Sequence, residues 1–156
     1  MSLYSKWMVW IIGLVVLGCG EKIQDFDPNK DRLEGKIAGE AWAYRTGNLR
    51  YSTSINALTG LIVDFDVQEP CGVRLTSQPH VELRIPAQRG NYDLNSFTDN
   101  RLYLKLHHEN STKIYTATAG FVEVLAISQL EAMGFISAEF DENNKVQGSF
   151  LLRICN

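Results

Sequence analysis

Residues 134–155 read GFISAEFDENNKVQGSFLLRIC, and this stretch decides the fold class. Its segments 134–140 and 146–155 are typical of two strands, and the polar residues 141–145 between them predict a turn. In the second segment, alternate side chains share one face, as the pleat of a strand requires: Val146, Gly148, Phe150, Leu152 and Ile154. The stretch therefore predicts an antiparallel hairpin with a buried face.

The same period of two recurs from Leu33 onward, without a convincing helical repeat. We expect an opening hairpin from residues 33–38 and 41–45, which places Trp42 in the interior. Residues 114–127 predict one bent strand or two, broken near Gly120, and only residues 128–133 could form a helical turn. Three further segments predict half-buried strands, with these apolar residues on their buried faces: Leu61, Val63, Phe65 and Val67; Val81, Leu83 and Ile85; Leu102, Leu104 and Leu106.

Size and composition favour one compact domain over residues 33–156. The chain has 156 residues, of which 45% are apolar and 21% charged, as in an average soluble protein. About eight antiparallel strands with one apolar face each would form an all-β sandwich, and a barrel-like variant is also possible. The net charge of −3 lacks the basic excess that nucleic-acid binding requires, so no nucleic-acid partner is expected.

The first residues are typical of a signal peptide. Lys6 is followed by an uncharged, mostly apolar run that ends before Cys19 and is too short for a membrane-spanning helix. Gly18 before the cysteine and aliphatic residues upstream resemble a bacterial lipobox. We expect cleavage after residue 18 and acylation of Cys19, palmitate included. An ordinary secretory peptide or an uncleaved anchor is the alternative.

Residues 19–32 are polar and charged, which predicts a flexible tether between the lipidated cysteine and the domain. Such a tether reaches about 20 Å. Acyl chains on Cys19 would hold the protein on a membrane. The expected location is therefore the cell envelope, with the domain anchored to the outer membrane on its periplasmic or outward face.

Cys71 and Cys155 are the remaining cysteines. In an oxidising compartment such a pair predicts a disulfide, which would connect the end of the last strand to a turn in the middle of the chain. Two separate reduced cysteines are the alternative. A catalytic thiol is a weaker hypothesis, because no local signature links either cysteine to a histidine.

The chain contains no strong catalytic or metal-binding motif. His107 and His108 are neighbours on a predicted strand, so their side chains point to opposite faces and cannot chelate one metal ion there. We expect no catalytic residue, metal or cofactor. The predicted strand 101–107 offers a possible ligand-facing surface, with these side chains opposite its leucines: Arg101, Tyr103, Lys105 and His107.

Five segments together resemble small Bacteroidetes-type lipoproteins of uncharacterised function. They are Val16-Leu17-Gly18-Cys19, the run GKIAGEAW at 35–42, Ile85-Pro86, Gly90-Asn91-Tyr92 and the run VQGSF at 146–150. The resemblance implies an envelope location and a single β-rich domain. Its motifs consist of turn glycines and core aromatic residues, so it implies no catalytic residue.

These observations lead to a functional hypothesis. We expect a membrane-anchored envelope lipoprotein, not an enzyme, whose domain binds a protein or a glycan. The alternative is an envelope hydrolase that acts on glycan or peptidoglycan through carboxylates brought together by the fold. A third possibility is a structural subunit recruited through an unpaired edge strand.

Overall fold

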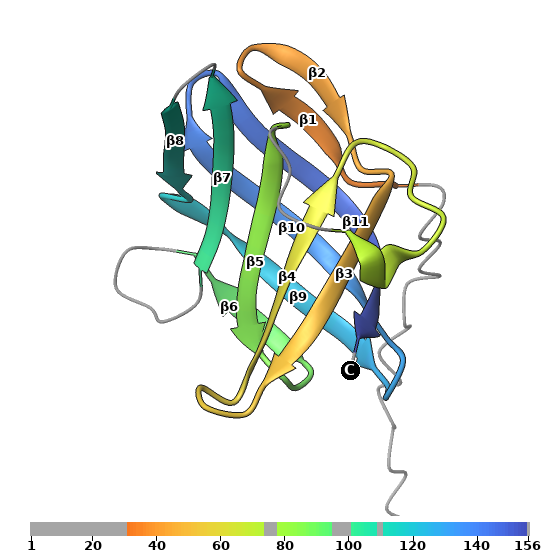
Figure 1. Ribbon diagram of the computed structural model, residues 1–156. Helices are drawn as coiled ribbons and strands as arrows, with labels where there is room; N and C mark the ends of the chain where they lie inside the picture. The colour runs from red at the N-terminus through yellow and green to blue at the C-terminus, as the bar shows by residue number, and fades with distance from the viewer. Residues whose placement is uncertain (1–30, 74–77, 95–100, 109–110, 156) are drawn as a thin grey trace, which may run out of the picture.

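The computed structural model of the chain describes residues 31–73, 78–94, 101–108 and 111–155. In these residues the structure consists of strands and one short 3-10 helix, η1 (Figure 1). Their bounds are β1 (Glu34–Ile37), β2 (Glu40–Ala43), β3 (Thr46–Ser52), β4 (Ala57–Val63), η1 (Pro70–Gly72), β5 (His80–Pro86), β6 (Gly90–Asp93), β7 (Arg101–His108), β8 (Ser111–Thr116), β9 (Ala119–Ile127), β10 (Glu131–Asp141) and β11 (Asn144–Cys155).

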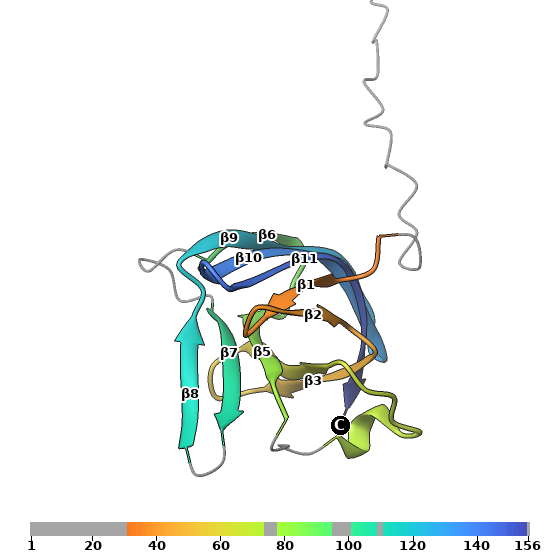
Figure 2. The same cartoon turned by 90° about the horizontal axis from the view of Figure 1, so that it is seen from above.

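The described strands form one continuous sheet in the order β6-β9-β10-β11-β3-β4-β5-β7-β8. The sheet curls, so that β9, β10 and β11 face β3, β4, β5 and β7 (Figure 1). β1 pairs with both β11 and β2, and this hairpin lies at the upper end of the curled sheet in Figure 1. Figure 2 shows it between the two layers. Every pairing of named strands is antiparallel except that of β11 with β3.

The all-β expectation is confirmed, and the curled sheet corresponds to the barrel-like variant. Two details differ from the expectation. Eleven strands are described instead of about eight, because β3 and the four-residue β6 were not predicted as strands and the segment 114–127 contains parts of both β8 and β9. One pair is parallel, and alternation along a strand cannot reveal this because it indicates which face is buried but not which strand lies beside it.

The core lies between the two layers of the curled sheet. Val81, Leu83 and Ile85 of β5 are at most 1% exposed, as their alternation predicts. They pack in one cluster with buried residues of the facing layer, among them Ile136, Phe150 and Leu152. Complete burial of such side chains contributes roughly 1.5–3 kcal/mol each, so this cluster supplies most of the driving force for folding.

Both predicted hairpins are present. β10 pairs with β11 through Gly134↔Phe150 and Ala138↔Val146, and the turn is shorter than predicted because Asp141 and Asn144 are already paired. β1 pairs with β2, and Trp42 is buried. Two predictions for the residues between these hairpins differ in part from the structure. The segment 114–127 belongs to two strands, β8 and β9, as one of the two alternatives had it, but the break lies at residues 117–118 and not at Gly120. β10 already begins within residues 128–133, the segment that could have formed a helical turn.

Tyr44 follows β2 and fastens the opening hairpin to β11. Its side chain is buried, and its hydroxyl donates a hydrogen bond to the carbonyl oxygen of Leu151. The guanidinium carbon of Arg32 lies 5.0 Å from the centre of the ring. Burial raises the pKa of Tyr44 above its ordinary value, and the positive charge of Arg32 partly opposes that rise.

Two glycines allow strands to approach more closely than a side chain would permit. A Cβ atom at Gly60 in β4 would lie 1.9 Å from the carbonyl oxygen of Asn48 on the neighbouring strand. Gly148 of β11 has φ +139°, and a Cβ there would lie 2.6 Å from the carbonyl oxygen of Arg32. The second glycine lets residues 31–33 run directly against β11, where the Leu33 amide donates to the Ser149 carbonyl oxygen at 2.9 Å.

Cys71 and Cys155 form a disulfide, as predicted, with their Cα atoms 5.6 Å apart. The bond joins η1 to the last residue of β11. A segment that leaves the sheet after β4 is thereby held against the end of β11.

Candidate functional site

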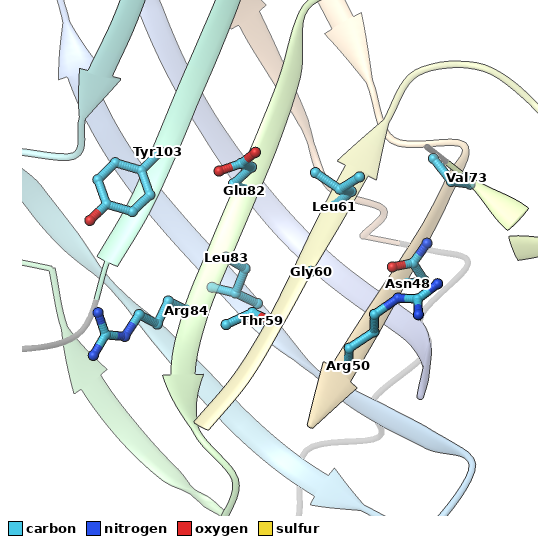
Figure 3. Close-up of a pocket in the computed structure, with 10 residues that line it drawn as sticks. All are labelled: Asn48, Arg50, Thr59, Gly60, Leu61, Val73, Glu82, Leu83, Arg84 and Tyr103. Carbon is cyan, nitrogen blue, oxygen red and sulfur yellow. The ribbon is translucent and has the colours of Figure 1, made fainter. Parts of the chain in front are cut away.

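A groove of about 400 Å³ crosses the outer face of the layer formed by β3, β4, β5 and β7. Figure 3 shows the residues that line it on these strands. The floor and walls combine charged, polar, aliphatic and aromatic groups: Asn48, Arg50, Thr59, Gly60, Leu61, Val73, Glu82, Leu83, Arg84 and Tyr103.

The register of the sheet explains why these residues meet. Asn48 pairs with Leu61, Leu61 with Glu82, and Glu82 with Tyr103, so these four residues form one row across four strands. Residues that pair directly across strands place their side chains on the same face. With about 4.8 Å between neighbouring strands, the row extends about 14 Å, long enough for an extended ligand.

A second row runs beside the first. Arg50 pairs with Thr59, and Thr59 with Arg84, so Thr59 lies between two arginines (Figure 3). Arg50 is exposed and Arg84 is half-buried. The charged side chains described in the lining are therefore two guanidinium groups and the carboxylate of Glu82.

One wall of the groove is held in place by η1. The Asn48 side-chain amide donates to the Pro70 carbonyl oxygen at 2.7 Å, and an Arg50 guanidinium N–H donates to the Cys71 carbonyl oxygen at 3.2 Å. The disulfide fixes Cys71 to β11. The groove wall and the disulfide therefore form one connected unit.

Glu82 is half-buried in the middle of the first row and lies close to a buried histidine. Its Oε1 atom is 3.6 Å from Nε2 of His80, whose side chain is 1% exposed. The other ring nitrogen of His80, Nδ1, is 3.0 Å from the Gln78 carbonyl oxygen. These contacts restrict the histidine ring on one side of the Glu82 carboxylate.

The predicted ligand-facing strand is β7, and the groove includes one of its four predicted residues. Tyr103 lines the groove. The backbone register places Arg101 opposite Arg84, Lys105 opposite His80 and His107 opposite Thr112. The side chains of Arg101, Lys105 and His107 lie outside the described part of the structure, as does the predicted lipidation site Cys19.

The sequence did not identify the remaining groove residues. Leu61 was expected on the buried face with Val63, Phe65 and Val67, but Leu61 lines the groove and its neighbour Ile62 is fully buried. The prediction for Leu61 was wrong because β4 ends at Val63. Phe65 and Val67 lie beyond the strand, so their alternation does not indicate which side chains of β4 point inward. Alternation in β5 correctly placed Glu82 and Arg84 on the outer face.

Among the described residues, no group of three or more histidines, cysteines or acidic residues could hold a metal ion. Glu82 is the one carboxylate that the described lining contains. Within the same residues, no helix is long and apolar enough to span a membrane. The charged and aromatic side chains described in the groove are therefore those of two arginines, one glutamate and one tyrosine.

β8 is a second surface feature, because it pairs with β7 along one edge and no pairing is described along its other edge. Ile114 in this strand is 56% exposed. Lys113 lies with its ammonium nitrogen 4.6 Å from the centre of the Tyr115 ring, and the hydrogen bond and charge of Tyr115 raise the pKa of Lys113. A lysine on an edge strand discourages pairing with another strand.

No family model, curated protein or solved structure matches this chain. The functional inference therefore rests on the geometry of the groove and on the sequence.

Proposed function

We propose that the protein is a lipid-anchored binding module of the cell envelope, tethered through Cys19, that takes up a glycan or protein segment in the groove of β3, β4, β5 and β7. The observation that carries the proposal is the groove itself. It combines an aromatic wall, a half-buried arginine and a carboxylate on rigid strands. Polar groups held on strands orient a ligand with little loss of side-chain freedom on binding.

The direction of the groove supports this proposal. Residues 31–33 lie against β11, in the layer of β9, β10 and β11 (Figure 2). The groove lies on the outer face of the opposite layer. The predicted tether, residues 19–32, would therefore connect an acylated Cys19 to the layer opposite the groove.

Binding is favoured over hydrolysis by the groups that line the groove. Glycoside hydrolysis in most enzyme families uses two carboxyl groups about 5–10 Å apart, one as acid and one as base or nucleophile. The described lining offers Glu82 together with arginines and a tyrosine, a set suited to holding a ligand through hydrogen bonds and ring contact.

Two measurements in cells of the native host test the anchor and the groove separately. Labelled palmitate should be incorporated into the wild type and not into Cys19→Ala, and the variant should leave the membrane fraction. Incorporation that survives the substitution would refute the anchor.

For the groove, a photo-crosslinking residue in place of Thr59 should capture an envelope component. The same residue in place of Lys145, which is 53% exposed on the opposite layer, is the matched control and should not capture it. Equal capture at the two positions, or none at Thr59, would refute the groove as the binding surface.

A further inference from the structure

We propose that the groove recognises a carboxylate-bearing sugar, with the carboxylate held by Arg84 and the sugar ring against Tyr103. This inference rests on the proposed function and names the class of ligand for the same site. The contacts of the arginines, the charge balance of the lining and the surface beside the arginines support it in turn.

Arg84 is half-buried beside the aromatic wall, yet none of the described residues accepts a hydrogen bond from its guanidinium or pairs with its charge. A cation that has lost part of its hydration without gaining an anionic partner is costly, and a bound anion would offset that cost. Arg50 differs from Arg84, because its Nη2 donates to the Cys71 carbonyl oxygen and its side chain lies at the other side of the groove (Figure 3).

Arg84 is the arginine that stands beside the aromatic ring. The two arginines pair with Thr59 from opposite sides, which puts their Cα atoms about 10 Å apart across two strand spacings. Figure 3 shows their side chains extending away from Thr59, Arg84 on the side of Tyr103 and Arg50 toward the wall at Asn48 and Val73. A planar guanidinium fork matches the two oxygens of a carboxylate.

The charge balance favours a carboxylate over a phosphate. The described charged side chains in the lining are Arg50, Arg84 and Glu82, which together carry a net charge of about +1 when each is ionised. A phosphate monoester carries about −1.5 to −2 at neutral pH. Its second negative charge would lie next to Glu82, whereas a carboxylate brings a single negative charge.

The surface beside the arginines favours a sugar over a simple carboxylic acid. Glu82 stands between Leu61 and Tyr103 in the first row, so a hydroxyl-bearing ring placed there meets a carboxylate acceptor and apolar surface on either side. Figure 3 shows the Tyr103 ring and Arg84 on the same side of the groove. A pyranose carries hydroxyls around its edge and C–H groups on its faces, which is the complement of this surface.

Titration of the full-length protein in detergent micelles tests the inference. The probes are D-glucuronate and D-glucose, which share a ring and differ in the carboxylate. Charge-assisted hydrogen bonds to the Arg84 guanidinium should make glucuronate bind about tenfold more tightly. Arg84→Ala should remove most of this preference, and Arg50→Ala should retain more of it than Arg84→Ala does.

Two further variants keep the test interpretable. Arg153→Ala removes an exposed arginine of β11 that does not line the groove and should leave the preference intact. Arg84→Lys keeps the charge but loses the fork, and should retain part of the preference. Melting curves identify any variant that has lost its fold.

Several outcomes would overturn the inference. Glucuronate binding no tighter than glucose, a preference that survives Arg84→Ala, or inorganic phosphate binding more tightly than glucuronate would each contradict it. Acetate binding as tightly as glucuronate would show an anion site without sugar recognition. If glucuronate shows no preference over glucose while the Thr59 crosslink still captures an envelope component, the ligand class is wrong but the groove remains the binding surface. If the crosslink also captures nothing, the proposed function is refuted as well.

Discussion

The disulfide Cys71–Cys155 should determine both the stability of the domain and the integrity of the groove wall. The bonded residues are 84 positions apart, and closing a loop of this length removes unfolded-chain entropy worth about 4.6 kcal/mol at 25 °C. With an unfolding entropy of about 2.1 cal/mol/K per residue, that difference lowers the melting temperature of a domain of this size by about 18 °C. We therefore expect the double variant Cys71→Ala/Cys155→Ala to fold but to melt about 18 °C below the oxidised wild type.

The assay compares the wild type with and without a reductant, and uses the double variant as the control that should not respond to reductant. Amide hydrogen exchange well below the melting temperature gives the local readout. Reduction should accelerate exchange at Val73, which donates to Pro70 within η1, and should leave Leu33, which donates to Ser149, protected. A melting shift below about 3 °C, or equal exchange changes at the two amides, would refute this reasoning.

Four other substitutions have expected outcomes that follow from local geometry. In urea unfolding, Gly60→Ala should cost more than about 3 kcal/mol because its Cβ would overlap the Asn48 carbonyl oxygen, whereas Gly39→Ala, with φ +81° and open space, should cost about 1 kcal/mol. The raised pKa of Tyr44 favours its neutral form in the folded state, so the free energy of unfolding should fall as pH rises through and above about 10. Tyr44→Phe should lose about 1 kcal/mol of stability near pH 7, because the hydrogen bond to Leu151 is removed. The same variant should show a smaller decline in stability at alkaline pH. Lys145→Ala should change stability by less than about 0.5 kcal/mol, because its ion pair with Glu139 is more than half exposed at both ends.

Local alternation was enough to predict the class of fold and most strand faces. Val81, Leu83 and Ile85 alternate with polar residues, and the structure buries all three. The Cys71–Cys155 bond followed from the number of cysteines and the predicted compartment. The strand faces depend on residues that are close in sequence. The disulfide was predictable because, apart from the predicted lipidation site Cys19, the chain has two cysteines.

The groove could not be predicted in the same way, because it depends on which strands lie side by side. Arg50 and Arg84 are brought to opposite sides of Thr59 by two successive strand pairings, and neither strand pattern reveals its neighbour. Leu61 lies in an apolar run with Ile62 and Val63, where alternation alone does not determine which side chains point inward. Tyr103 was identified because it stands opposite leucines within a single strand.

Mapping the backbone amide signals of the full-length protein by NMR, as solubilised envelope material is added, tests the central claim most directly. If the groove is the binding surface, the shifted signals will cluster at Arg50, Thr59, Glu82, Arg84 and Tyr103, and β9 and β10 will be unaffected. Shifts confined to the edge strand β8, or to the layer of β9 and β10, would contradict the claim.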